Sequence, residues 1–136
     1  MFQSLLAGKT LLLVDDRPEN LLALEALLEG SGAVLLKAFS GNEALKMLHR
    51  NPTGIACILM DVQMPEMNGY EAASILQQRP ETAAIPVLFV TAQESGFASV
   101  EEPYATVLTR PVFLHKPFNA QSLLVALQAV LLTEKA

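Results

Sequence analysis

The stretch IACILMD, residues 55–61, decides the fold: six apolar residues without a polar interruption, closed by an aspartate. A strand with one face in water alternates apolar and polar residues, so this run indicates a strand buried on both faces. LLLVDD at 11–16 has the same form, and PVLFVT at 86–91 ends on threonine. Weaker candidate strands lie at 33–39 and 112–116. A parallel sheet covered on both sides is the predicted architecture.

Helical patterns separate these strands. Pro18 suits the first position of a helix, and leucines follow at helical spacing until Gly30. The sequence SGNE at 40–43 has the form of a capping box and predicts the start of a second helix. Further helices are expected at 69–78 and 119–132. Strands alternating with helices predict an α/β fold.

The segment 94–110 resists assignment. Pro103 and Pro111 interrupt it, and Glu101-Glu102-Pro103 is more typical of a turn than of a helix interior. A helix should cross here between the fourth and fifth strands. We expect this fourth-helix region to be irregular.

Composition restricts the function. The chain has 136 residues, 9 basic and 14 acidic, which gives 9 − 14 = −5. This charge disfavours binding to nucleic acid or to an anionic membrane. With Cys57 as its one cysteine the chain has no internal disulfide, and no apolar run reaches the length of a membrane span. We expect a single cytoplasmic domain over 1–136, with its core at 9–133.

The strands end on polar residues: Asp15 and Asp16, Asp61, Thr91 and Lys116. The carboxyl ends of parallel strands share one edge, where α/β proteins bind ligands. In the strand order 2-1-3-4-5 the three aspartates become neighbours. Any one of them could merely cap the following helix. Five polar residues ending four strands favour a site, and three carboxylates without nearby His or Cys suit Mg²⁺.

Four motifs together resemble the receiver (response-regulator) domain of two-component signalling. They are LLLVDD at 11–16, LMDVQMPEMNG at 59–69, FVTA at 89–92 and KPF at 116–118. The resemblance implies a flavodoxin-like (CheY-like), doubly wound parallel sheet of five strands in the order 2-1-3-4-5. It also implies a signalling switch that catalyses only its own phosphorylation and dephosphorylation, rather than an enzyme acting on other substrates.

The resemblance assigns the acidic residues. Asp61 would accept a phosphoryl group from a sensor histidine kinase or a histidine phosphotransfer protein. Asp16 and Asp61 would bind Mg²⁺, with Mn²⁺ as a possible substitute, Asp15 would act through water, and the main-chain carbonyl of Gln63 would complete the protein ligands.

The remaining roles follow from the same resemblance. Lys116 and the Ala92 N–H would bind phosphoryl oxygens, and the Thr91 hydroxyl would move toward the new charge. Phe113 would turn into the space that Thr91 leaves. Pro117 occupies the position where the family keeps a cis peptide bond.

Two features depart from the family. Residues 108–111, LTRP, replace its usual Gly-Ala pair, and the helix at 119–132 has apolar residues around most of its circumference. One stripe suffices to cover a sheet, so a homodimer or another domain could dock on the face formed by the fourth and last helices. A deeply buried last helix is the alternative.

Two other functions fit the same residues. One is a degenerate receiver that serves as a protein-binding or dimerisation module without phosphorylation. The other, less favoured, is a small Mg²⁺-dependent phosphohydrolase. Haloacid-dehalogenase-like enzymes need a second aspartate two residues after the nucleophile, and position 63 is glutamine.

Overall fold

The structure is a computed structural model, and it describes residues 2–51, 54–92 and 112–133. The helices in this part are α1 (Phe2–Leu6), α2 (Pro18–Leu27), α3 (Gly41–Arg50), α4 (Gly69–Gln78) and α6 (Ala120–Thr133). The strands are β1 (Thr10–Val14), β2 (Val34–Ala38), β3 (Ile55–Asp61), β4 (Val87–Thr91) and β5 (Val112–His115).

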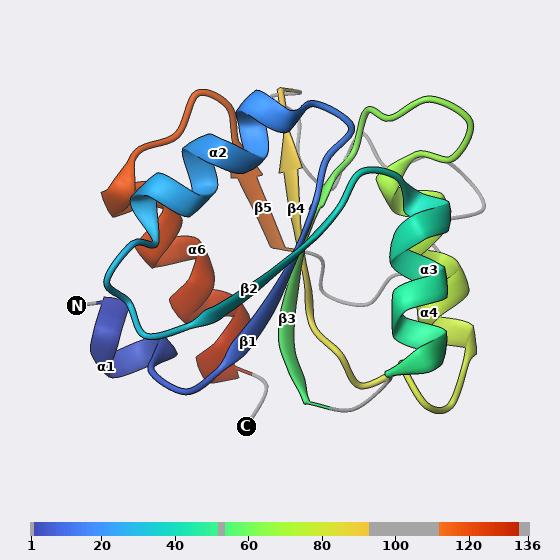
Figure 1. Cartoon of the computed structure of the whole chain (residues 1–136), viewed down its shortest axis with the longest axis horizontal. Coiled ribbons are helices and arrows are strands. Elements are labelled where there is room, and N and C mark those ends of the chain that lie inside the picture. Colours follow the sequence, from blue (N-terminus) through green and yellow to red (C-terminus); the bar gives the residue numbers. More distant parts are fainter. Residues whose placement is uncertain (1, 52–53, 93–111, 134–136) are drawn as a thin grey trace.

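The five strands form one parallel sheet in the order β2-β1-β3-β4-β5 (Figure 1). Both the predicted strand order and the α/β class are confirmed. The register pairs Val14 with Met60 and Thr91 with His115, so the strands end close to one level at one edge. The polar residues that end or follow the apolar strands therefore lie at this common edge.

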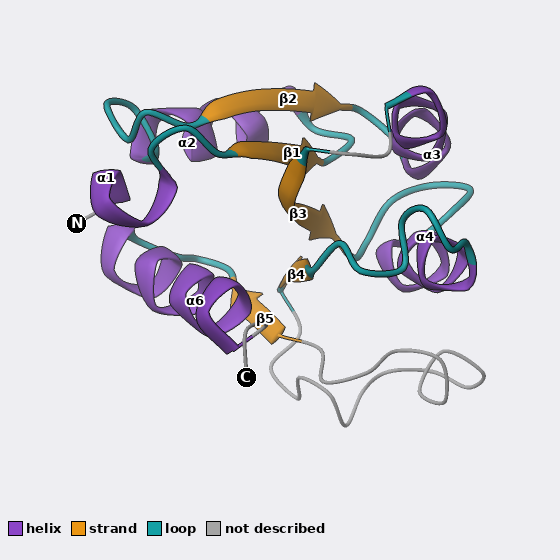
Figure 2. Ribbon diagram, turned by 90° about the horizontal axis from the view of Figure 1, so that it is seen from below, coloured by secondary structure: helices purple, strands orange, loops and turns teal. Residues whose placement is uncertain are grey.

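Helices cover both faces of the sheet, with α3 and α4 on one side and α1, α2 and α6 on the other (Figure 2). Side chains alternate along a strand between these two layers. On β3, Ile58 and Met60 join the core beneath α3 and α4, whereas Cys57 and Leu59 join the opposite core. All four are buried, which explains the unbroken apolar run.

Two helices begin at side-chain caps. The Ser40 hydroxyl accepts a hydrogen bond from the Glu43 N–H (3.0 Å), and the Glu43 carboxylate accepts one from the Phe39 N–H. The Asn68 side chain accepts from the Glu71 N–H (2.8 Å) at the start of α4. The predicted capping box is confirmed, except that Glu43 bonds the N–H of Phe39, one residue before the cap Ser40, rather than that of Ser40 itself.

Helix α1 was not predicted from the sequence. It is only five residues long and lies beside α6, on the face of the sheet that α2 also covers (Figures 1 and 2). Leu6 has no exposed surface, and the Gln3 side-chain amide donates to the Gly30 carbonyl (2.8 Å). The apolar core thus includes a residue that precedes position 9.

Helix α6 buries more than one stripe. Leu123, Leu124 and Leu127 are buried, whereas Val125 and Leu132 are about half exposed. Residues 94–111, including LTRP at 108–111, lie outside the described residues, so the expected irregular region and a docking face that includes it stay predictions. No helix in the described part is long and apolar enough to cross a membrane.

Candidate functional site

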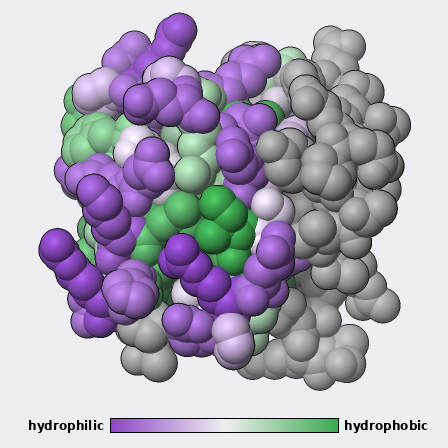
Figure 3. Space-filling view, turned by 90° about the vertical axis from the view of Figure 1, so that its right-hand side faces the viewer, coloured by the Kyte–Doolittle hydropathy of each residue, from purple (hydrophilic) through white to green (hydrophobic). Residues whose placement is uncertain are grey.

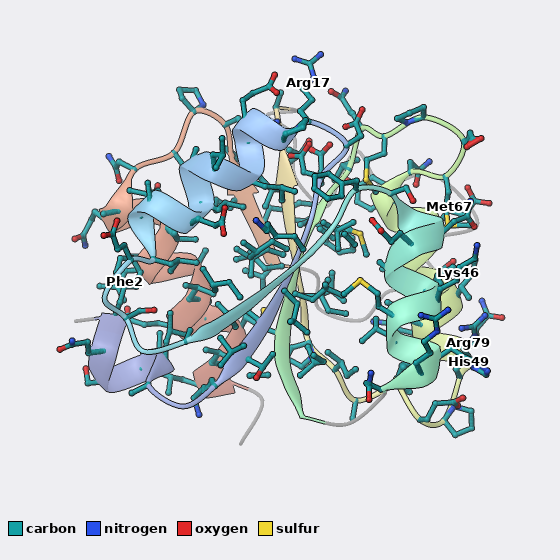
Figure 4. The ribbon with its side chains drawn as sticks, viewed as in Figure 1. Phe2, Arg17, Lys46, His49, Met67 and Arg79 are labelled. Carbon is teal, nitrogen blue, oxygen red and sulfur yellow. The ribbon has the colours of Figure 1, made fainter. Side chains whose placement is uncertain are left out.

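The functional side chains lie at the carboxyl edge of the sheet. Asp15 and Asp16 follow β1, Asp61 ends β3, Thr91 ends β4, and Lys116 follows β5. Arg17, labelled in Figure 4, follows Asp16 and marks this edge. Parallel strands in the order observed bring these residues together although Asp15 and Lys116 are 116 − 15 = 101 positions apart in the sequence.

Three carboxylates form a cluster at this edge. Asp15, Asp16 and Asp61 each place a carboxylate oxygen within 4.8 Å of the other two. Asp15 and Asp61 are buried, with 3% and 4% of their surfaces exposed, and Asp16 is half-buried. Carboxylates packed this closely repel one another unless positive charge lies among them.

Lys116 brings one positive charge to the cluster. Its ammonium lies 3.1 Å from Asp61 Oδ1 and 3.7 Å from Asp15 Oδ2. Its main-chain N–H donates to the Thr91 carbonyl (2.8 Å), which joins the end of β5 to the end of β4. The Lys116–Pro117 peptide bond is cis, as the resemblance implied.

Asp15 is held by two contacts that the sequence analysis missed. The Arg17 N–H donates to Asp15 Oδ1 (2.9 Å), and the Asn20 side-chain amide donates to Asp15 Oδ2 (3.1 Å). Asn20 lies in the first turn of α2, and this helix begins two residues after Asp16. A polar residue so soon after the two aspartates was the sequence signal that could have indicated this contact. These donors orient Asp15 without adding a full positive charge.

Asp61 titrates well above its usual range. Burial, followed by the nearby Asp15 carboxylate, raises the pKa of its carboxyl from 3.8 to about 6, although Lys116 lowers it. One cation therefore does not balance three carboxylates. The cluster favours a further positive charge.

Gly69 brings the start of α4 against Asp61. A Cβ atom at position 69 would lie 2.3 Å from the Asp61 main-chain oxygen and 3.0 Å from Met60 Cγ. The Gly69 N–H donates to the Val62 carbonyl (2.9 Å). Only glycine permits this approach, so the helix fixes the backbone on both sides of the Asp61–Val62 peptide.

The other predicted site residues lie in or shortly after β3, β4 and β5. Thr91 is buried at the end of β4, Ala92 follows it and is exposed, and Gln63 is exposed two residues after Asp61. Phe113 on β5 is half-buried and packs against Phe89, with 5.7 Å between the ring centroids. Phe113 thus belongs to an aromatic cluster with Phe89 and Tyr70.

The donor set matches a hard divalent cation. Its ligand atoms are all carboxylate oxygens, and no His or Cys belongs to the group within the described residues. Mg²⁺ and Ca²⁺ prefer oxygen ligands, and a site with few carboxylates plus water suits Mg²⁺. The uncompensated negative charge at Asp61 supports the same conclusion.

The family model of the response regulator receiver domain matches residues 11–128. Protein PilH of Pseudomonas aeruginosa is 32% identical over 121 residues, which cover 89% of this chain and 96% of PilH. The chain belongs to the receiver domains of two-component signalling, so this part of the expectation is confirmed. Receiver domains are signalling switches.

Solved structures agree with this assignment. Chemotaxis protein CheY4 of Vibrio cholerae superposes with a TM-score of 0.78 at 28% identity, covering 92% of this chain and all of CheY4. The receiver domain of sensor histidine kinase PA1611 from Pseudomonas aeruginosa gives 0.76 at 28% identity, covering 92% and 98%. That structure has a magnesium ion coordinated in its active-site cleft.

Proposed function

We propose that the whole chain is one receiver domain that accepts a phosphoryl group on Asp61 in the cytoplasm. The donor is the phosphohistidine of a sensor histidine kinase or of a histidine phosphotransfer protein. A carboxylate oxygen of Asp61 attacks phosphorus, the bond from phosphorus to the imidazole nitrogen breaks, and the imidazole leaves and takes up a proton. The observation that supports this proposal most directly is the buried Asp61 carboxylate, which lies close to two other carboxylates and to the Lys116 ammonium.

Mg²⁺ is the proposed cofactor, held by Asp16 and Asp61, by Asp15 through water and by the Gln63 carbonyl. When bound, it neutralises charge on the carboxylates and on the transferring phosphoryl oxygens. Mn²⁺ has similar oxygen preferences and is the proposed substitute. The PA1611 receiver, with magnesium in its cleft, supports this choice.

Lys116 and the residues after β4 bind the transferred group in this proposal. The Lys116 ammonium keeps its contact with Asp61 and pairs with a phosphoryl oxygen. The Thr91 hydroxyl and the Ala92 N–H donate to other phosphoryl oxygens. Phosphorylation adds about −1.5 to −2 charge beside Thr91. Phe113 then turns toward the space that Thr91 vacates, which changes the surface presented to a partner.

Intact mass spectrometry tests the chemistry directly. The wild type is incubated with acetyl phosphate, with Mg²⁺ or with EDTA, beside Asp61→Asn and Asp16→Asn. We expect a gain of one phosphoryl group in the wild type with Mg²⁺, none in Asp61→Asn, and a strong reduction in Asp16→Asn.

Two controls keep the result decisive. Phosphoramidate replaces acetyl phosphate as a second donor, and circular dichroism verifies that each variant is folded. A folded wild type that gains no mass with either donor in Mg²⁺ contradicts the proposal. Equal gains in the wild type and Asp61→Asn would move the phosphoacceptor to another residue.

A further inference from the structure

A groove between α3 and α4, lined by none of the three site carboxylates, gathers positive charge. It has a volume of about 500 Å³, and its lining residues are Asn42, Leu45, Lys46, His49, Arg50 and Arg79. Three of the chain's nine Lys and Arg side chains thus lie in one groove of a protein with net charge −5. Lys46, His49 and Arg79 lie together on this side of the molecule in Figure 4.

No salt bridge within the described residues holds these cations, and Glu43 is the one carboxylate that lines a groove with Lys46 and Arg50. The salt bridges within the described residues involve Lys37 and Lys116, not Lys46, Arg50 or Arg79. Glu43, also on α3, accepts a hydrogen bond from the Phe39 N–H and serves the helix start. Three cations against one carboxylate leave this surface with net positive charge that an outside group can pair with.

Apolar side chains continue the surface on the other side of α3. Phe39 is 46% exposed and shares a groove with Lys46 and Arg50. Leu36 is 37% exposed and lines an adjoining apolar groove of about 240 Å³ with Met47 and Arg50. In Figure 3, which faces α3 and α4, a green apolar area lies among purple hydrophilic side chains.

We propose that this α3 surface, defined by Leu36, Phe39, Lys46, Met47, Arg50 and Arg79, binds an acidic segment of a partner protein that also carries apolar side chains. Carboxylates of the segment pair with Lys46, Arg50 and Arg79. Its apolar residues cover Leu36, Phe39 and Met47. Arg50 lies in all three grooves, so it contacts both halves of the segment.

Charge selects a protein segment over other anions. Nucleic acid and anionic membranes extend far beyond the groove, and the net charge of −5 repels them there. A small phosphate ligand gains nothing from the exposed Leu36 and Phe39. A short acidic amphipathic segment matches the local cations and the apolar side chains, and avoids the negative remainder of the surface.

The test uses the full chain and a fluorescein-labelled peptide of about 14 residues. Leucines at helical spacing form one face of the peptide and glutamates form the rest. Fluorescence polarisation gives the affinity, and ¹⁵N NMR shifts give the location. The variant Lys46→Glu/Arg79→Glu reverses the charge at two residues that line the groove. The matched control Lys9→Glu/Arg17→Glu changes net charge equally at two exposed residues outside the α3 surface, and circular dichroism verifies folding.

We expect Lys46→Glu/Arg79→Glu to weaken binding at least roughly tenfold, and the control much less. Phe39→Ala should also weaken binding, whereas Leu22→Ala, on the exposed side of α2, should not. A glutamine version of the peptide should bind poorly, and high salt should weaken the glutamate peptide. NMR shifts should centre on α3 and on residues 36–39.

Three results would overturn the proposal. They are equal affinities for the groove variant and its control, NMR shifts centred on another surface, and no shifts at millimolar peptide. Single-stranded DNA and phosphatidylglycerol vesicles serve as competitor probes. If either binds more tightly than the peptide, with the same dependence on Lys46 and Arg79, the occupant is a different macromolecule.

Discussion

At the scale of single residues, the Asp61 carboxylate is buried among like charges and only partly compensated by Lys116. Its folded pKa, raised to about 6, exceeds the usual 3.8, so between these values the folded chain holds a proton that the unfolded chain releases. In metal-free buffer, the contribution of Asp61 to stability is therefore greatest below about pH 4 and is lost as the pH rises through 6.

Asp61→Asn removes the cost of burying an ionised carboxylate at position 61. At pH 7.5 with EDTA we expect the variant to be more stable than the wild type by about 1 to 3 kcal/mol in urea unfolding, since one pKa unit corresponds to about 1.4 kcal/mol. The difference should shrink toward pH 4.5. Added Mg²⁺ should stabilise the wild type and not the variant. A wild type more stable than Asp61→Asn at pH 7.5 in EDTA would contradict this account.

Gly69 is a second residue with a specific requirement. Gly69→Ala places a Cβ atom 2.3 Å from the Asp61 main-chain oxygen, so the backbone of Asp61 or of α4 has to shift. We expect a loss of roughly 2 to 4 kcal/mol in the free energy of unfolding, somewhat above common overpacking costs. Phosphorylation by acetyl phosphate should slow as well, because Asp61 must shift.

Gly41→Ala is the matched control for that substitution. Its Cβ would meet mainly the flexible Met67 side chain, 3.0 Å from Sδ, which can move aside. We expect a change within about 1 kcal/mol, helped by the higher helix propensity of alanine. Equal losses at the two positions would show that general crowding, not the Asp61 backbone, sets the cost.

At the scale of elements, the Asn68 cap determines where α4 begins. Its side chain accepts the Glu71 N–H at 2.8 Å, next to Gly69. Asn68→Ala should lower the free energy of unfolding by about 1 kcal/mol, and Asn68→Asp should largely retain it. Urea denaturation measures both. Ser40→Ala removes the corresponding cap of α3, which bonds Glu43 and not the backbone beside Asp61, so only Asn68→Ala should also slow phosphorylation.

Local signals accounted for most elements. The apolar runs ending at Val14 and Asp61, Pro18 before α2 and the cap at Ser40 each rest on neighbouring residues, and the structure has the elements they predicted. Helix α1 escaped prediction because five residues are too few to show a helical period. Its Leu6 is buried by contacts with distant parts of the chain, which no local pattern reveals.

Much of the candidate site was also predictable. Polar residues at strand ends and a parallel sheet suffice to gather Asp15, Asp61 and Lys116. The hydrogen bond from Asn20 to Asp15 and the approach of Gly69 to Asp61 were not predicted. Both depend on how the loops after the strands turn back, and strand periodicity contains no information about that.

At the scale of the whole molecule, α1 completes the core on the side of α2 and α6. Leu6 is fully buried there, so Leu6→Ala leaves a cavity and should cost about 2 to 4 kcal/mol. Leu22→Ala removes the same atoms from a side chain that is 63% exposed and should cost under about 0.5 kcal/mol. Thermal and urea unfolding compare the two. A loss for Leu6→Ala as small as that expected for Leu22→Ala would mean that α1 contributes little to stability.

The two proposed activities use different residues in different parts of the molecule. The carboxylate cluster lies at the carboxyl edge of the sheet, whereas the α3 surface lies on one face. Charge reversal at Lys46 and Arg79 should therefore leave the mass gain with acetyl phosphate unchanged. Loss of phosphorylation in that folded variant would show that the two regions are coupled.

The contact between Gly69 and the Asp61 backbone also supplies a spectroscopic reporter. The Gly69 N–H donates a hydrogen bond to the carbonyl of Val62, the residue after Asp61, and the backbones of Gly69 and Asp61 are in direct contact. Glycine amides occupy a sparsely populated part of the ¹⁵N spectrum, so one peak could be followed through metal binding and phosphorylation without any attached label. The shift of this peak during a titration would report whether the Asp61 carboxylate is free, bound to metal or phosphorylated.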